Sequence, residues 1–207
     1  MKQLIFATNN KHKVQEVRAA LQGHVEVVSL AEAGLSGEIP ETADTLQGNA
    51  LQKAQWVWER THTDCFADDT GLEVDALDGA PGVYSARYAG EHCSFDDNID
   101  KLLDALQGKT DRKADFRTVI CLIESQSRKD EDSTTPRLCD FTTQFFEGRV
   151  DGQILTERHG AEGFGYDPVF MPDRFAVSFA EMPLDVKNSI SHRGLAVAKL
   201  KEYLEAQ

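Results

Sequence analysis

The chain has 207 residues, and 22 Lys and Arg against 35 Asp and Glu give it a formal net charge of −13. Hydrophobic residues make up 41 % and charged residues 28 % of the sequence, which is ordinary for a globular protein and excludes a disordered or collagen-like chain. The acidic excess argues against a nucleic acid polymer as partner, because proteins that bind one usually present a basic face. No apolar run approaches the roughly 18 residues of a membrane helix, and the N-terminal apolar stretch is too short for a signal peptide. A reducing cytoplasm is therefore the expected compartment, in keeping with four cysteines that include no CxxC pair.

Apolar periodicity predicts strands alternating with helices in the first third of the chain. Residues 3–7 and 25–28 are expected to form short strands, and helices are expected over residues 11–22 and 45–60. Residues 65–67 predict a brief buried strand, which ends in the sequence Asp-Asp-Thr-Gly.

The rest of the chain mixes helices with a strongly strand-like middle. The expected elements are a helix with a capping box over residues 94–106, strands over 116–123, 138–146 and 148–154, and a final helix over 191–205. The charged stretch 125–137 is interpreted as a solvated hairpin tip, and Leu195, Ala198 and Leu204 as the inward face of the last helix. Because the middle holds an antiparallel stretch, the pattern predicts an α/β chain with a mixed sheet.

One candidate binding motif joins the first strand to the first helix, with the sequence Thr8, Asn9, Asn10, Lys11, His12 and Lys13. A strand-to-helix turn points backbone N–H groups and the positive end of the helix at an incoming phosphate, and Lys13 adds a cation. The alternative is an ordinary helix cap with solvated lysines. The phosphate loops GxxxxGK[ST] and GxGxxG are both absent from the chain.

Carboxylates form the second motif. Asp68 and Asp69 follow a buried strand, where two adjacent charges need compensation, and oxygen ligands there suit Mg²⁺ with substrate phosphates. In a strand-like stretch the two side chains point to opposite faces and so differ in role; an Asx turn at Asp69 is the alternative. Glu41 could complete a metal site and Lys53, four residues after Asn49, could meet a phosphate, although isolated residues of this kind are usually solvated.

Two later motifs suit a nucleotide base. Phe164 between glycines, in residues 163–168, can expose an aromatic ring for stacking, with a core phenylalanine in a tight turn as the alternative. Near the start of the last helix lie three basic residues, Lys187, His192 and Arg193. Cations are unfavourable at the positive end of the helix dipole, and an anionic or acceptor-rich ligand would compensate for this; simple solvation is the alternative.

In this order the motifs resemble those of the inosine triphosphate pyrophosphatase family, the dITP/XTP house-cleaning enzymes. The matching stretches are residues 8–16, Pro40-Glu41, Asn49-Ala50, Lys53-Ala54, and residues 67–72, 79–87, 162–168 and 191–194. The resemblance spans nearly the whole chain; Ala43 and Gly48 depart from it, since the family often has Gly and Glu at these positions.

The resemblance implies a single nucleoside triphosphate pyrophosphatase domain over residues 1–207, with an elongated mixed β-sheet flanked by helices and two lobes around a central cleft. It also implies a homodimer, a Mg²⁺ cofactor, and hydrolysis of a purine triphosphate to the monophosphate and pyrophosphate. Carried over by motif, Glu41 and Asp69 hold the metal and Asp69 is the base for water. The triphosphate then meets residues 8–13 and Lys53, and the nucleotide meets Thr70, Phe164, Gly165, Tyr166, Asp167, Lys187, His192 and Arg193.

Base selection follows from hydrogen bonding. Hypoxanthine and xanthine present an acceptor at O6 where adenine presents a donor, so a donor such as Arg193 would be left unpaired by ATP.

Two other functions remain possible from the sequence. A Maf-type pyrophosphatase would differ in base preference, and a nucleotide sensor without turnover would release no pyrophosphate.

Overall fold

The structure is a computed structural model that describes residues 2–126 and 141–207. The chain divides into two compact units. Unit 1 comprises Met1–Asp69, Val119–Phe146 and Val197–Gln207, and unit 2 comprises Thr70–Thr118 and Glu147–Ala196.

Within the described residues seven strands form one sheet, with the hydrogen-bonded order β2-β1-β3-β5-β6-β7 and β4 paired to β3. Their bounds are β1 Lys2–Phe6, β2 Val25–Ser29, β3 Cys65–Val74, β4 Pro81–Gly82, β5 Lys113–Ser125, β6 Phe141–Ile154 and β7 Phe170–Pro172. Strand β1 pairs in parallel with β2 and β3, whereas β4 and β7 pair antiparallel with β3 and β6. The sheet is therefore mixed, as the sequence predicts.

Five α-helices accompany the sheet in the described part of the chain. They are α1 Lys11–Leu21, α2 Leu46–Thr61, α3 Phe95–Ala105, α4 Leu184–Ile190 and α5 His192–Glu205. Short 3-10 turns occupy Asp75–Leu77, Ser85–Arg87, Asp167–Val169 and Phe179–Glu181. None of the described helices combines the length and the apolar composition needed to cross a membrane.

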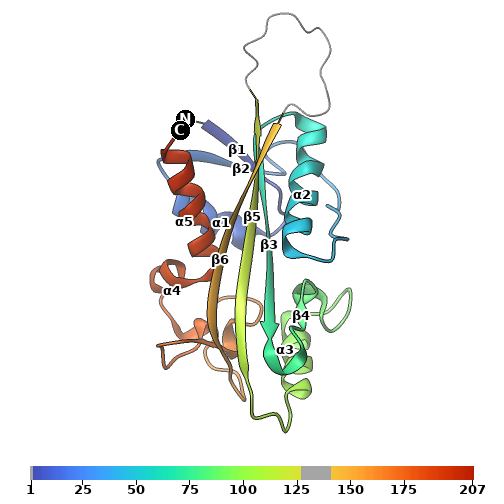
Figure 1. The fold of residues 1–207 in the computed structure, drawn as a ribbon, viewed down its shortest axis with the longest axis vertical. Coiled ribbons are helices and arrows are strands. Elements are labelled where there is room, and N and C mark those ends of the chain that lie inside the picture. The colour runs from blue at the N-terminus through green and yellow to red at the C-terminus, as the bar shows by residue number, and fades with distance from the viewer. Residues whose placement is uncertain (1, 127–140) are drawn as a thin grey trace, which may run out of the picture. The chain divides into compact units, whose positions relative to one another are not determined.

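In unit 1 helices cover both faces of the strands (Figure 1), with α2 on one side and α1 and α5 on the other. Helix α2 packs its residues Ala50, Ala54 and Val57 against the strand residues Ile5, Cys65, Ala67, Cys121 and Ile123 and against Ala7, which follows β1. On β1 and β3, Phe6 and Phe66 stack with ring centroids 4.5 Å apart. Strands buried on both faces explain the unbroken apolar runs of the sequence.

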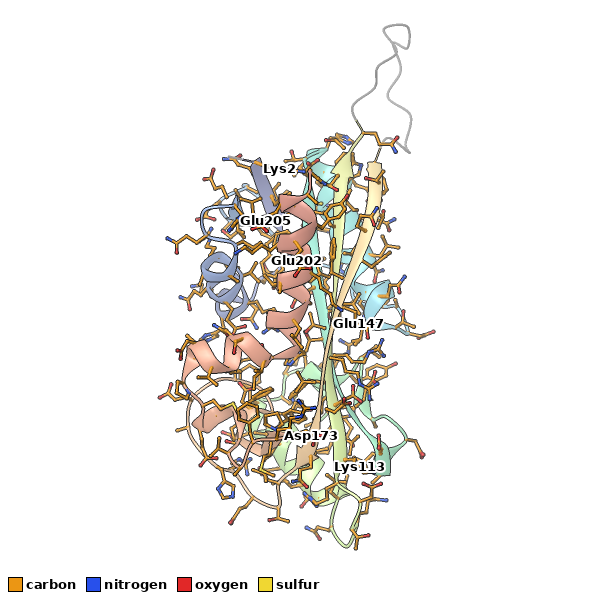
Figure 2. All side chains as sticks on the ribbon, turned by 60° about the vertical axis from the view of Figure 1, so that its left-hand side comes forward. Lys2, Lys113, Glu147, Asp173, Glu202 and Glu205 are labelled. Atoms are coloured by element: carbon orange, nitrogen blue, oxygen red, sulfur yellow. The ribbon has the colours of Figure 1, made fainter. Side chains whose placement is uncertain are left out.

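Unit 2 has its own core. Helix α3 begins at the predicted capping box, in which Ser94 and Asp97 bond each other's backbone, and it buries Ile99 and Leu102. These side chains pack with Phe116 of β5, Phe170 of β7, and further residues of β3 and the loops. On the strands, Glu147 of β6 (Figure 2) pairs with Arg117 of β5 at 3.1 Å.

Three expectations about elements are corrected. Strand β3 continues through the Asp-Asp-Thr-Gly sequence to Val74, and β6 is one strand where two were expected. Helix α5 buries Ala196, Val197 and Leu200, whereas Ala198 is exposed and Leu195 and Leu204 are half-buried. The hairpin tip expected at 125–137, and the first residues of the strand expected at 138–146, fall largely outside the described residues.

Candidate functional site

Unit 1 gathers two lysines and three carboxylates, Lys13, Glu41, Lys53, Asp68 and Asp69, which we call the lysine–carboxylate cluster. Asp68 and Asp69 are buried neighbours on β3, 2 % and 7 % exposed, and their side chains leave opposite faces of the strand. Lys13 of α1 donates to Asp68 Oδ1 at 3.0 Å, while Lys53 of α2 donates to Asp69 Oδ1 at 2.8 Å. The two aspartates thus serve different partners, as the alternation predicts, and the Asx turn considered for Asp69 is wrong.

Helix α2 connects this strand to the loop that carries Glu41. Lys53 Nζ also donates to Glu41 Oε1 at 2.7 Å, so two carboxylates converge on one ammonium group. Asn49, one turn earlier, donates to Asp69 Oδ2 at 3.1 Å and accepts the backbone N–H of Ala43 at 2.9 Å. Both helix residues are buried, so the interpretation of Asn49 and Lys53 as solvated is wrong.

Burial and neighbouring charges shape the cluster. Burial, the largest influence, raises the pKa of the Asp69 carboxyl, although Lys53 and Lys13 act in the opposite direction. Burial alone would lower the pKa of Lys53, but Asp69, Glu41 and Asp68 outweigh it and the pKa is raised. Lys53 therefore stays charged at neutral pH, and Asp69 is a stronger base than an ordinary aspartate.

The donor set fits a divalent cation bound together with phosphates. Among the described residues no group of three or more His, Cys, Asp or Glu is arranged to hold a metal by itself. Mg²⁺ needs less than this in nucleotide enzymes, because it keeps waters and binds one or two carboxylates plus substrate oxygens. Glu41 and Asp69 supply two carboxylates that already point at the same small cation, the ammonium of Lys53.

The turn after β1 is built as a helix cap. Asn10 Oδ1 accepts the backbone N–H groups of His12 and Lys13, and Thr8 Oγ1 accepts the N–H of Asn10 at 3.2 Å. Asn9 donates its side-chain amide to the Gly37 carbonyl at 3.3 Å, and Lys11 and His12 are exposed. Two N–H groups at the start of α1 are thus engaged by the Asn10 side chain, and the lysines of this turn are Lys11 and Lys13.

Unit 2 carries a second group of predicted residues, arranged around Asp167. Asp167 Oδ2 accepts the backbone N–H of Phe164 at 2.7 Å and the ammonium of Lys187 at 2.6 Å. Lys187 Nζ and the Arg193 guanidinium lie 5.1 and 5.4 Å from the centre of the Phe164 ring, within the range of cation–π attraction. We call Phe164, Asp167, Lys187 and Arg193 the aromatic cluster.

The other predicted residues of unit 2 differ in burial and in contacts. Tyr166 is 4 % exposed and donates its hydroxyl to the Ser85 carbonyl at 2.9 Å. His192 stacks on Phe116 with centroids 4.5 Å apart. Gly165 adopts a φ of +63° that favours glycine. Thr70 shares a 2.7 Å hydrogen bond with Thr118, a residue that the sequence analysis does not identify.

The structure also reveals a positioning residue in unit 1. Asn49 joins the Glu41 loop to Asp69 by accepting from one and donating to the other. Its spacing of four from Lys53 placed both on one helix face, but nothing in the sequence showed that this face is buried against carboxylates.

Lysines that can neutralise phosphate charge, together with carboxylates that can hold a metal, recur in enzymes of phosphoryl transfer. The comparison with protein families is specific: the chain belongs to the Ham1 family, whose model matches residues 4–203.

Known proteins agree with this assignment over nearly full length. The chain is 55 % identical to the dITP/XTP pyrophosphatase of Porphyromonas gingivalis, covering 99 % of this chain and 98 % of that protein. It is 47 % identical to the dITP/XTP pyrophosphatase of Flavobacterium johnsoniae, covering 98 % of each. Among solved structures it is similar to the Staphylococcus aureus Ham1 protein, with a TM-score of 0.84 at 36 % identity and 99 % coverage of both chains. A HAM1 protein from Coxiella burnetii gives a TM-score of 0.85 at 33 % identity over the full length of both chains.

Proposed function

We infer that this protein hydrolyses nonstandard purine nucleoside triphosphates, namely ITP, dITP and XTP, to the monophosphate and pyrophosphate. The observation that carries this inference is the convergence of Glu41 and Asp69 on Lys53 in a chain of the Ham1 family. Relatives named dITP/XTP pyrophosphatase support the substrate class and favour it over a Maf-type activity.

In this proposal the lysine–carboxylate cluster handles the phosphates. Glu41 and Asp69 hold Mg²⁺, which when bound neutralises phosphate charge. Lys13, Lys53 and the polar residues 8–12 bind the triphosphate. One ammonium about 4 Å from a phosphate charge contributes about 4 kcal/mol at an effective dielectric of about 20, so the two lysines are major stabilisers of the departing pyrophosphate.

Asp69 is the proposed general base. Its carboxylate accepts a proton from water as the water oxygen bonds to the α-phosphorus, and the bond from that phosphorus to the bridging oxygen of pyrophosphate breaks. Hydrogen bonds from Lys53 and Asn49 use one lone pair on each Asp69 oxygen, so each oxygen keeps one for the metal or the proton. The raised pKa of Asp69 favours this role, because a base works best with a pKa near the working pH.

The aromatic cluster of unit 2 is proposed to bind a purine base, with Thr70, Gly165, Tyr166 and His192 shaping its surroundings. Arg193 is the candidate donor to O6 of hypoxanthine or xanthine, an atom that adenine replaces with an N–H donor. A polar site of this kind can reject the wrong analogue by about 10⁴-fold or more.

We further propose that residues 1–207 work as one catalytic domain, as a homodimer, on the nucleotide pool of the cytoplasm. The near-complete coverage of relatives with a single named activity supports the one-domain assignment. Light scattering on the purified protein measures the oligomeric state.

Pyrophosphate release decides the central proposal. The purified protein is assayed with ITP, XTP, dITP, GTP and ATP, with Mg²⁺ and then with excess chelator. We expect turnover of ITP, XTP and dITP at least 100-fold above ATP, and its loss on chelation. Nucleotide binding without pyrophosphate release would identify a sensor instead.

A further inference from the structure

Phe95 is an aromatic side chain that the proposed function does not use. It is the first residue of α3, immediately after the Ser94 cap, and its side chain is 51 % exposed. The helix start is stabilised by Ser94 and Asp97 and does not need a phenylalanine here. An exposed phenyl ring forgoes the free energy that burial would give, so a ligand that covers it would gain affinity.

The exposed ring adjoins the aromatic cluster. Phe95 and Phe164 have ring centroids 6.4 Å apart with a 45° angle between the ring planes, within the range of aromatic pairs. Both residues belong to unit 2.

A separate set of hydrogen bonds fixes the start of α3 to the loop before Phe164. Arg158, six residues ahead of Phe164, donates to the Asp96 carbonyl at 3.1 Å and to Asp100 Oδ1 at 2.7 Å. The first turn of α3 and the chain that leads to Phe164 are therefore tied together independently of the ring contact.

From these contacts we propose that Phe95 is a base-binding residue that packs against the purine base beside Phe164. This proposal rests on the proposed function, because it assigns the base to the aromatic cluster. Planar purines stack on phenyl rings regardless of charge, and two rings meeting at an angle offer a flat ligand a face and an edge. Phe95 adds affinity for the base, and Lys187 and Arg193 near Phe164 can hydrogen-bond to the polar edge of the base.

The test compares Phe95→Ala with Phe95→Trp, using Phe175→Ala as the matched control, since Phe175 is an exposed phenylalanine of the same unit. Four constants are measured: the Kd for inosine monophosphate by calorimetry, kcat and KM for ITP, and the inhibition constant of inorganic tripolyphosphate. Thermal unfolding checks that each variant folds.

We expect Phe95→Ala to raise the inosine monophosphate Kd and the ITP KM by about 5-fold to 100-fold, with kcat within a factor of about three. Phe95→Trp should retain or improve both constants, and tripolyphosphate inhibition should not change in any variant. A folded Phe95→Ala protein with wild-type Kd and KM, or with tripolyphosphate inhibition weakened to the same degree, would overturn the proposal. Failure of the wild-type protein to release pyrophosphate counts against the proposed function alone, because inosine monophosphate binding still tests Phe95.

Discussion

Asp69 is the residue of the lysine–carboxylate cluster that acts as the base in the proposed mechanism. It lies on a buried strand, receives hydrogen bonds from Lys53 and Asn49, and has a pKa raised by burial. We expect Asp69→Asn to lower kcat for ITP by about 10²–10⁴-fold, because the amide cannot accept the proton of water. Pyrophosphate release measures the change. We expect the variant to fold, because Lys53 keeps its hydrogen bond to Glu41, and circular dichroism checks this.

The matched control is Asp75→Asn, an exposed aspartate just beyond the end of β3, for which we expect wild-type kcat. Near-normal turnover of Asp69→Asn would remove Asp69 from the mechanism.

Asp167 shows how one carboxylate positions several groups. Its Oδ2 atom holds both the Phe164 N–H and the Lys187 ammonium, and Asp167 and Lys187 are 3 % and 5 % exposed. Asp167→Asn leaves a buried ammonium without its charge partner, so we expect the free energy of unfolding to fall by about 3–5 kcal/mol. Urea denaturation measures this loss.

A second substitution separates charge from shape at this pair. Adding Lys187→Met to Asp167→Asn removes the stranded ammonium, so the double variant should recover part of the lost stability while its ITP KM stays high. If the double variant instead has a lower free energy of unfolding than Asp167→Asn alone, the two substitutions destabilise the protein separately and the two side chains do not act as a pair.

At the scale of elements, helix α2 meets the Glu41 loop at Gly48. A Cβ atom at Gly48 would lie 2.7 Å from the Ala43 Cβ, too close for two carbon atoms. Gly48→Ala improves helix propensity by up to about 1 kcal/mol, yet it must displace Ala43, two residues from Glu41. We expect the variant to have a lower kcat/KM for ITP, by about tenfold, without a loss of thermal stability.

The contact also predicts a rescue. Ala43→Gly removes the opposing methyl group, so the double variant Ala43→Gly with Gly48→Ala should recover most of the lost kcat/KM, while Ala43→Gly alone should change it little. Additive effects of the two substitutions would show that Gly48 and Ala43 do not act on the Glu41 loop through this contact.

Elements with a strong local signal were predictable from the sequence. The capping box at Ser94 and the helix expected over residues 45–60 both appear where the pattern places them. The sequence predicts too short a strand at β3, because Asp68, Asp69 and Gly71 are poor strand residues. In the fold, pairing of the two aspartates with Lys13 and Lys53 overrides that preference. In α5 the inward face was misassigned because apolar residues surround the helix, so periodicity did not single out one face.

At the scale of the whole chain, the residue types of the site were predictable and their pairing was not. Motif order alone led to the family that the comparisons establish. The partners of Asp68 and Asp69 lie 55 and 16 residues away in sequence, on different helices. Spacing within one chain segment carries no information on such contacts, so it could not predict the burial of Lys53 or the bridging role of Asn49.

The two ends of the chain meet in a second charged network. Lys2 of β1 bonds Glu124 Oε1 at 2.6 Å and Asp64 Oδ2 at 3.2 Å, and Tyr203 and Gln207 also donate to Glu124. Figure 2 shows Lys2 close to the part of α5 that carries Glu205. Burial acts to raise the pKa of Glu124, but bonds from Lys2, Gln207 and Tyr203 outweigh it and the pKa is lowered.

A carboxyl whose pKa is lower in the folded state stabilises the protein above its unfolded pKa, and this stabilisation disappears as the pH falls through the folded pKa. The pKa of Asp64 is likewise lowered, because hydrogen bonds from Ser125 and Lys2 outweigh the opposing effect of burial. We therefore expect the free energy of unfolding to fall as the pH drops below about 4.5, as measured by urea denaturation between pH 3 and 7. Glu124→Gln should make this fall shallower than in the wild type, whereas Glu202→Gln, an exposed change on the same helix as Tyr203, should leave the slope unaltered. Equal slopes for the wild type and Glu124→Gln would mean that the contacts joining the chain ends do not couple folding to the ionisation of Glu124.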